Sequence, residues 1–516
     1  MADFYYSFQA KSVPAKFSKL YKRQLDVTSG LTIFSNYEIE EYQSKRATAF
    51  IIGTSTVIGK EKGSFVTNVL NSFEPAKSMP AIQRSLVGQY VIVITTDEGK
   101  SYIQSDFLNI RSIYFDAAAR EAASSIGALE AFSNGEKDDY KTFEFRAMRG
   151  CIYPQWLGSA TALPSVSRLR TCQYLEIDHS TGLICVHDTV IRMDNTKPAS
   201  PEKNAMICTG ILKSIIGSFS NYRAASTITG GYDSRIISTI CSKKIDDLTL
   251  RISTMGNPDF KDLKIARKVA RVLGRRMAVY TANMEKDADN FFNYTDGLTP
   301  FENCIVTSMM YRTGDFAVGF GGTLGTEIFS TLRYVSCNEL IDDFCRIASQ
   351  QDNVEEEYVK RFEQSLRDEF AHISTHIKLA LNEERDIVRL FWTFATARFA
   401  SPIVSAFDIN GHQMEPFATF PMVEAALGIS YDYQGDSKTY GRFYMIPKMI
   451  MKSISTRVGI IDSTHFAPFL PLSFFTFPMY VIGKIKAIIY FRTRKVNQLP
   501  FLWDAGYRKY YDSGKD

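Results

Sequence analysis

The chain has 516 residues, more than one hydrophobic core normally supports, so two or three domains are expected. Its 60 lysines and arginines nearly balance 56 aspartates and glutamates, and a net charge of +4 does not indicate a surface built for nucleic acid. The apolar share of 45% and the charged share of 22% are those of an ordinary globular protein and exclude a largely disordered chain.

Short apolar alternations dominate the first 200 residues and predict strands and hairpins. Residues 89–95 alternate before a turn at 97–99, and residues 174–178 and 183–186 flank a turn at 180–182. We therefore expect a sheet-rich domain over residues 1–195. A polar, proline-containing stretch at 194–203 is the best linker candidate.

Beyond the linker the pattern changes to strands that alternate with helices. Residues 205–219 have a helical pattern, and an apolar strand at 224–228 runs directly into a glycine pair. A second strand at 248–253 precedes a helix at 262–273, which Gly274 ends, and a third strand follows at 277–280. This order predicts a doubly wound parallel sheet within residues 204–516, with ligands at the carboxyl ends of its strands.

Cysteine spacing and the apolar run near the C-terminus indicate in which cellular compartment the protein is expected. The eight cysteines occur singly, with no C-x-x-C pair, which fits a reducing cytoplasm better than a disulfide or zinc framework. The first residues lack the basic region and apolar core of a secretion signal. Three prolines interrupt the uncharged run at 466–483, which favours a buried, broken segment over a spanning helix; contact with a membrane surface or an apolar partner is the alternative.

The segment with the clearest chemistry is residues 229–235, Thr-Gly-Gly-Tyr-Asp-Ser-Arg, between a predicted strand and helix. The glycine pair lets backbone amides converge on an anion at the start of the helix. The hydroxyls of Thr229 and Ser234 and the guanidinium of Arg235 are further donors, and Asp233 suits a Mg²⁺ ion that bridges phosphates. The segment is not a Walker A loop, and glycine pairs also occur in ordinary turns.

This segment resembles the Ser-Gly-Gly-x-Asp-Ser loop of ATP pyrophosphatases, and its surroundings resemble the asparagine synthase family. The further matching segments, in chain order, are residues 105–114, Asp262 within 256–266, the glycine-rich residues 318–322, and residues 415–419. The resemblance implies an α/β chain: an N-terminal nucleophile (Ntn) hydrolase-like, glutaminase-derived domain, followed by a parallel-sheet nucleotide-binding synthetase domain that uses ATP and Mg²⁺.

Two departures from the family pattern refine the expected activity. Glutamine-hydrolysing members carry an N-terminal cysteine nucleophile, whereas residue 2 here is Ala2, so glutamine hydrolysis by this route is not expected. The pattern is similar to that of β-lactam synthetases and lasso-peptide cyclases. It implies an amide-forming ligase that adenylates a small-molecule or peptide carboxylate and transfers it to an amine. The second departure is Thr323 or Thr326 where the family has a metal-binding aspartate.

The resemblance assigns roles to individual residues. Glu327 is either a metal ligand or general base, or a solvated helix-start carboxylate; Lys448 and Arg442 are either cations at the phosphates or surface groups. The full set expected at the site comprises, for the nucleotide, Ile228, Thr229, Gly230, Gly231, Asp233, Ser234, Arg235, Ser253 and Gly319; for the metal, Asp233 and Glu327; for catalysis, Glu327, Lys448 and Arg442.

Other readings stay open at this point. A non-catalytic relative that binds nucleotide or a partner protein is the main rival, and the threonines at 323 and 326 favour it. An RNA-modifying enzyme is disfavoured by the near-neutral charge. His372 and His376 have helical i, i+4 spacing but no H-E-x-x-H arrangement, so they predict a solvated helix face and no zinc site.

Overall fold

The computed structural model describes residues 4–8, 23–28, 31–35, 38–124, 126, 129, 138–153, 155–196, 200–254, 261–281, 316–329, 334–351, 354–407, 412–429, 445–463, 468–471, 473 and 475–493. The chain divides into two compact units. The first comprises Met1–Thr196, Leu332–Ser405 and Ala418–Leu427, and the second comprises Lys197–Thr331, Ala406–Phe417 and Gly428–Asp516. In this grouping, residues 332–405 and 418–427 belong with the N-terminal part, and the expected domains 1–195 and 204–516 stay a prediction.

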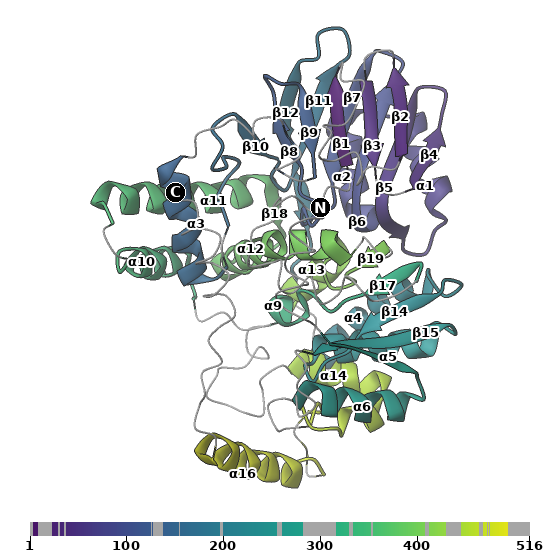
Figure 1. Cartoon of the computed structure of the whole chain (residues 1–516), viewed down its shortest axis with the longest axis vertical. Coiled ribbons are helices and arrows are strands. Elements are labelled where there is room, and N and C mark those ends of the chain that lie inside the picture. Colours follow the sequence, from purple (N-terminus) through teal and green to yellow (C-terminus); the bar gives the residue numbers. More distant parts are fainter. Residues whose placement is uncertain are drawn as a thin grey trace. The chain divides into compact units, whose positions relative to one another are not determined.

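The first unit contains two six-stranded sheets with antiparallel pairing, shown in Figure 1. One has the order β10-β8-β9-β1-β3-β2, with bounds Val166–Arg168, Tyr114–Asp116, Glu121–Ala123, Phe4–Phe8, Leu31–Ser35 and Arg23–Thr28. The other has the order β12-β11-β7-β6-β5-β4, with bounds Ile184–Asp188, Gln173–Asp178, Lys100–Ser105, Leu86–Thr96, Ala47–Val57 and Ile39–Gln43. The predicted hairpins are confirmed, while an Ntn-hydrolase-like character stays a prediction.

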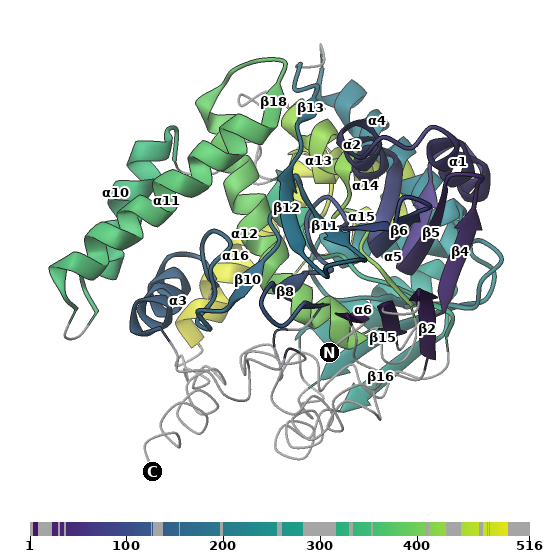
Figure 2. The same cartoon turned by 90° about the horizontal axis from the view of Figure 1, so that it is seen from above.

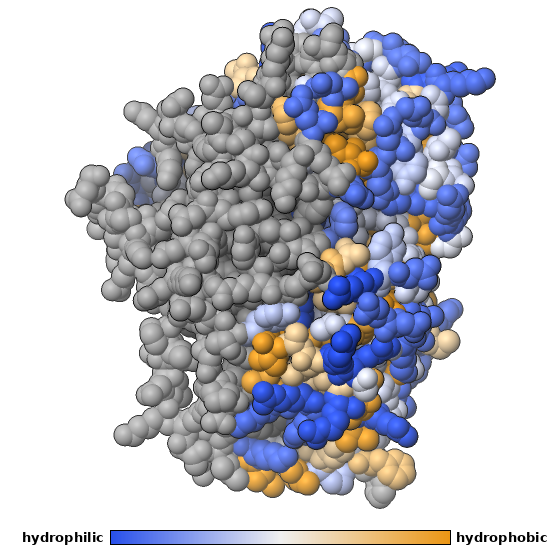
Figure 3. Space-filling view, turned by 45° about the vertical axis from the view of Figure 1, so that its right-hand side comes forward, coloured by the Kyte–Doolittle hydropathy of each residue, from blue (hydrophilic) through white to orange (hydrophobic). Residues whose placement is uncertain are grey.

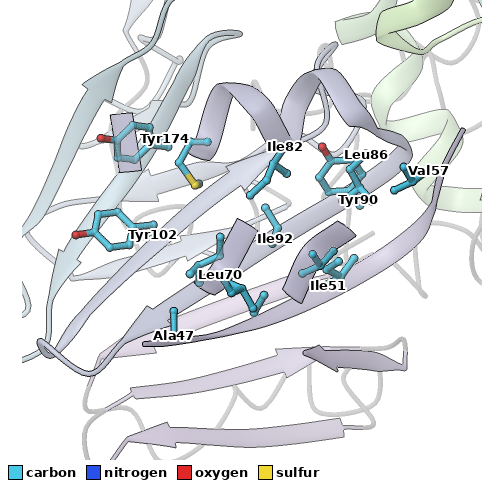
Figure 4. Close-up of a cluster of buried hydrophobic side chains, with 14 residues drawn as sticks. Ala47, Ile51, Val57, Leu70, Ile82, Leu86, Tyr90, Ile92, Tyr102 and Tyr174 are labelled. Atoms are coloured by element: carbon cyan, nitrogen blue, oxygen red, sulfur yellow. The ribbon is translucent and has the colours of Figure 1, made fainter. Parts of the chain in front are cut away.

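The alternation along β6 explains how these layers pack. Val91 and Val93 join a core shared with residues of the other sheet, such as Ile33, so the two sheets face each other. Ile92 and Ile94 point to the opposite face, where helices α1 (Lys62–Asn71) and α2 (Pro75–Ser85) cover the sheet. Figure 4 shows this second cluster, with Leu70 and Ile82 packed over the strands. Successive side chains of a strand point to opposite faces, so a continuous apolar run supplies both cores.

Helices from three segments of the chain complete the first unit. These are α3 (Asp139–Cys151), α10 (Cys337–Ala348), α11 (Glu356–His376), α12 (Glu384–Phe407) and α13 (Phe420–Leu427). Phe391 of α12 packs against Phe344 of α10 and Phe370 of α11, with ring centroids 6.3 and 4.8 Å away. Figure 2 shows α10 and α11 side by side. A short parallel pair, β13 (Ile191–Met193) with β18 (Ile377–Leu379), joins the N-terminal segment to the end of α11.

The second unit is built on a five-stranded parallel sheet in the order β16-β15-β14-β17-β19. The strand bounds are Met277–Thr281, Leu248–Thr254, Ala224–Thr227, Val318–Phe320 and His412–Met414. Among its described residues the helices are α4 (Pro201–Gly217), α5 (Asp233–Lys244), α6 (Lys261–Leu273), α9 (Gly325–Phe329), α14 (Met445–Ile454), α15 (Thr456–Gly459) and α16 (Phe477–Thr493). The predicted parallel sheet and its first strands and helices are confirmed. Because β14 pairs with β15 on one side and β17 on the other, the sheet reverses its winding at β14.

The apolar stretch at 466–483 was expected to be buried, but part of it is exposed. Leu470 is buried, but Phe475 is 86% exposed and Phe477 opens helix α16 with its ring exposed. No helix among the described residues is long and apolar enough to cross a membrane. On the face drawn in Figure 3, hydrophilic and apolar residues are intermixed over the coloured surface.

Candidate functional site

The predicted loop, residues 229–235, connects strand β14 to helix α5 and includes the first residues of that helix. The strand ends at Thr227, and the N–H of Ile228 still donates to the carbonyl of Arg251 on β15, at 2.9 Å. Helix α5 then begins at Asp233. The loop therefore sits at the carboxyl end of the central strand, at the reversal point of the sheet. Ligands of parallel α/β sheets bind at this position.

Three backbone amides of the loop are occupied by side-chain oxygens of the protein. Thr229 N–H donates to Ser234 Oγ at 3.0 Å, and Gly231 N–H donates to Thr229 Oγ1 at 3.1 Å. Gly230 N–H donates to Asp262 Oδ1 at 2.6 Å. These amides were expected to bind phosphate, but in this structure they donate hydrogen bonds to side chains of the protein. Asp262, which is absent from the predicted site, therefore contacts the loop directly.

The start of helix α5 offers donors of a second kind. Tyr232 is the N-cap residue and makes no side-chain capping hydrogen bond. The first amides of any helix lack acceptors within the helix and carry the positive end of its dipole. A phosphate group at this end would bond to amides and gain from the dipole. Anion binding at this loop would accordingly use the first turn of α5.

Arg235 has a different role from the one expected. Its guanidinium is fully buried and donates to the carbonyls of Ile461 at 2.8 Å, Gly230 at 3.1 Å and Asp462 at 3.2 Å. Burial lowers the pKa of Arg235 to about 10, so it stays charged at neutral pH. The guanidinium is therefore bonded to backbone carbonyls of the loop and of residues 461–462. Arg235 positions the loop, and its contacts do not support the expected role as a phosphate donor.

The glycine-rich turn after β17 packs directly on the loop. A Cβ at Gly322 would lie 2.6 Å from the amide nitrogen of Ser234, and a Cβ at Gly325 would lie 2.8 Å from Oδ1 of Asp233. Only glycine fits at such separations. The fold thus brings together two motifs that the sequence showed separately, with the Asp233 side chain against the start of α9.

Carboxylates near this turn are the candidates for holding a metal ion. Glu327 lies in α9, two residues beyond Gly325, and burial raises the pKa of its carboxyl. Carboxylate oxygens are the ligands that Mg²⁺ prefers, and a buried carboxylate gains most from a nearby cation. The carboxylates of Asp233 and Glu327 are therefore of the ligand type that a Mg²⁺ site requires. Thr323 instead donates its N–H to Glu415 Oε2 at 2.9 Å, and the side chain of Thr326 lies outside the described residues.

Gly319 has an internal role rather than the expected contact with a cofactor. A Cβ there would lie 2.5 Å from Gln413 Oε1 and 3.0 Å from Arg251 Nη2, so the space is filled by protein. Gln413 also donates to Glu415 Oε1 at 2.9 Å, and both side chains are fully buried. Burial raises the pKa of Glu415. This buried polar network connects β19 with the turn after β17. The sequence singled out the segments 318–322 and 415–419 but did not predict these contacts.

Three further residues of the predicted site are Ile228, Ser253 and Arg442. Ile228 is fully buried, so its side chain belongs to the core beside the loop. Ser253 lies in β15, but its side chain lies outside the described residues. Arg442 also lies outside the described residues.

Lys448 is a buried cation of the second unit. Its side chain, on α14, is only 2% exposed, and burial lowers the pKa of its ammonium group to about 8. The described residues supply it with neither a hydrogen-bond acceptor nor a counter-ion; its Nζ lies 5.1 Å from the ring centroid of Tyr480. A buried ammonium without an anion is costly, so this arrangement is typical of a site that receives a negatively charged ligand.

Aromatic contacts connect Lys448 with the loop. Helix α14 packs against α5, and the Tyr480 hydroxyl is close enough to Tyr232 for the two to interact electrostatically. Tyr232, the last residue before α5, stacks on Phe469 with ring centroids 4.2 Å apart. The loop, the start of α5 and the buried ammonium therefore belong to one neighbourhood.

Comparison with solved structures finds distant likenesses, among them two synthetases. NMN synthetase from Francisella tularensis is 12% identical, with a TM-score of 0.21 over 38% of this chain and 93% of that one. Glutamine-dependent NAD⁺ synthetase from Acinetobacter baumannii, solved with adenosine diphosphate, is 11% identical, with a TM-score of 0.19 over 60% of this chain and 84% of that one. Likenesses this weak identify neither a family nor an activity. No protein-family model and no curated protein matches the chain, so the resemblance to the asparagine synthase family stays a prediction.

Proposed function

We propose that the second unit binds ATP and that the protein is an ATP-dependent ligase, which activates a carboxylate as its adenylate and transfers it to an amine. The observation that carries this proposal is the buried ammonium of Lys448, which the described residues leave without a counter-ion. It lies on α14, which packs against α5, the helix that begins at the reversal point of the parallel sheet. A polyphosphate would supply the counter-charge for Lys448 and accept hydrogen bonds from amides at the start of α5.

The reaction requires two displacements. A carboxylate oxygen of the first substrate attacks the α-phosphorus of ATP, and pyrophosphate leaves. The amine then attacks the acyl carbon, and AMP leaves with the bonding electron pair while the amine nitrogen loses a proton. Lys448 and the first amides of α5 would stabilise the charge on the departing pyrophosphate. Holding the acyl adenylate and the amine in one site would make the second attack effectively intramolecular and limit hydrolysis of the adenylate.

A metal ion would assist the same step. Asp233 and Glu327 are the carboxylates at the turn that would hold Mg²⁺, which neutralises phosphate charge when bound. Arg235 and Asp262 would keep the loop in place through their bonds to its backbone. The acid is a small molecule or peptide, and the amine comes from the second substrate rather than from glutamine.

Pyrophosphate release tests this function. The protein is incubated with ATP, Mg²⁺ and a panel of carboxylates and amines, and AMP and pyrophosphate are measured. Both products should require acid and amine together, and Lys448→Met should lower the rate at least 100-fold. Lys452→Met, on the exposed side of the same helix, is the matched control and should leave the rate unchanged. Formation of ADP and phosphate in place of AMP and pyrophosphate would show that this chemistry is wrong.

A nucleotide-binding protein without turnover is the second candidate, and one observation favours it. Three loop amides are already bonded to Ser234, Thr229 and Asp262, and threonines stand at 323 and 326. Calorimetry with ATP distinguishes the two candidates. Binding that Lys448→Met weakens, together with no AMP from any substrate pair, would support the non-catalytic role.

A further inference from the structure

Three potential metal ligands meet within the first unit. Asp188 ends strand β12, and His372 and His376 lie one turn apart near the end of helix α11. One ligand atom from each residue lies within 4.8 Å of the others. We propose that Asp188, His372 and His376 form a binding site for a divalent transition-metal ion of the Zn²⁺ class. This site is independent of the nucleotide chemistry proposed for the second unit.

Strand pairing explains why these distant residues meet. Helix α11 continues directly into β18, and β18 pairs in parallel with β13, with Ile377 opposite Ile191. His376 is the residue before Ile377, so it lies beside the short connection between β12 and β13. That connection follows Asp188. The parallel pair thus holds the last turn of α11 against the end of β12, and the helical i, i+4 spacing adds His372.

Hydrogen bonds to backbone carbonyls fix the tautomer of each imidazole. His372 Nε2 lies 2.9 Å from the carbonyl oxygen of Thr171, and His376 Nδ1 lies 3.1 Å from the carbonyl oxygen of Thr189. A carbonyl oxygen only accepts, so the proton of each neutral ring is on the nitrogen that faces the carbonyl. The lone pairs therefore lie on Nδ1 of His372 and Nε2 of His376. Metal-binding histidines are usually oriented in this way, with the second nitrogen bonded to a carbonyl or carboxylate.

The third ligand is oriented in a similar manner and is accessible. Gln173 Nε2 donates to Asp188 Oδ1 at 2.9 Å, and the carboxylate is 54% exposed. His376 Nε2 lies 3.9 Å from Asp188 Oδ1. In a tetrahedral site, two atoms that each lie about 2.0–2.2 Å from one Zn²⁺ are about 3.3–3.6 Å apart. Side-chain rotations that bring the ligand atoms closer by up to about 1.5 Å would therefore complete the set. Two imidazoles and one carboxylate leave the fourth tetrahedral position for water.

The charges around the cluster are accounted for by the neighbouring residues. Arg170, whose charge acts on His372, pairs with the buried carboxylate of Glu369 at 3.1 Å, and Arg398 shares that carboxylate. The expectation of a solvated helix face at His372 and His376 is wrong, because both rings are partly buried and bonded to the backbone. Without metal, the two rings would serve only as donors to those carbonyls. A bound ion would in addition join residues 332–405 to the N-terminal segment of the unit.

Zinc titration of the full chain tests the site. Protein freed of metal with a chelator and desalted is titrated with ZnCl₂ against a chromophoric competitor. The wild type should bind one more Zn²⁺ per chain than His372→Ala/His376→Ala, which keeps every cysteine and so corrects for thiol binding. Asp188→Asn should weaken binding at least tenfold. His187→Ala, which removes the neighbouring imidazole of β12, is the matched control and should bind like the wild type.

Stability provides a second readout. Zn²⁺ at 100 times its Kd should raise the midpoint of thermal unfolding of the wild type and of His187→Ala but not of the double variant. Circular dichroism in chelator shows whether the double variant is folded. If it is not, Asp188→Asn decides, because the exposed carboxylate is not needed for packing. Equal uptake by the wild type and the double variant, or unweakened binding by Asp188→Asn, would overturn the three-ligand site.

Discussion

Arg251 on β15 reaches the side-chain amide of Gln413 on β19, with Nη2 3.3 Å from Oε1. The guanidinium crosses two intervening strands, and its Cζ lies 4.7 Å from the ring centroid of Phe316. The crossing is possible because Gly319 on β17 has no side chain. Burial lowers the pKa of Arg251 to about 10, although the charge of Glu415 opposes this. A buried polar network therefore joins the strands that carry the candidate site.

Gly319→Ala should destabilise the protein by about 1–3 kcal/mol, because its methyl group would overlap Gln413, Phe316 and Arg251. Urea unfolding monitored by circular dichroism measures this change. Gly210→Ala is the control: a methyl group added at this helical glycine of α4 would meet nothing within 4 Å, and the substitution should be stabilising by about 0.5–1 kcal/mol. Equal effects of the two substitutions would contradict the packing at Gly319.

Lys448→Met should stabilise the protein at neutral pH while it abolishes nucleotide binding. Burial lowers the pKa of Lys448 from 10.5 to about 8, which corresponds to a cost of about 3 kcal/mol for the charged form. The unfolded chain binds this proton more tightly, so the cost is present below pH 8 and disappears as the pH rises from 8 to 10.5. The stability advantage of the variant should shrink over that range. A difference in unfolding free energy that stays constant from pH 7 to 10 would refute the buried, unpaired ammonium.

Asp262→Asn should strengthen ATP binding about threefold to tenfold. The amide oxygen of asparagine can still accept from Gly230 N–H, while a negative charge close to the phosphate position, worth about 1 kcal/mol, is removed. Calorimetry with and without Mg²⁺ measures the effect, and Asp246→Asn, at an exposed turn of the same unit, is the control. Weaker binding that appears only with Mg²⁺ would instead identify Asp262 as a metal ligand.

Glu369→Gln should cost about 3–5 kcal/mol at pH 7, because it leaves buried guanidinium groups without their anion. Burial alone would raise the pKa of Glu369, but Arg398 and Arg170 outweigh it and hold that pKa well below its usual range. This stabilisation is complete above the unfolded pKa of about 4.5 and is lost as the pH falls through the folded value. The difference between variant and wild type should therefore shrink below about pH 4.5.

The exposed pair on the same helix supplies the control for Glu369. Glu363 lies 2.7 Å from Arg367, and both side chains are exposed. Glu363→Gln should change the unfolding free energy by less than about 1 kcal/mol. Thermal unfolding of both variants between pH 3 and pH 7 gives the comparison. A loss at Glu363 as large as that at Glu369 would contradict the dependence on burial.

Local patterns in the sequence determined the secondary structure and the position of the loop. Alternation predicted β6, and the switch to strands and helices predicted β14, α5, β15 and α6, because side-chain periodicity is a property of neighbouring residues. The glycine pair at 230–231 marked the turn between β14 and α5 for the same reason.

Partners of individual side chains were decided by the tertiary structure alone. Arg235 was a suitable phosphate donor by type, yet packing gives it the carbonyls of Ile461 and Asp462. The spacing of His372 and His376 predicted only a solvated helix face. In the structure, the pairing of β13 with β18 places Asp188 beside them. A hydrogen bond or a set of metal ligands depends on which distant segments pack together. A single sequence gives the residues of each segment but does not show which segments are in contact.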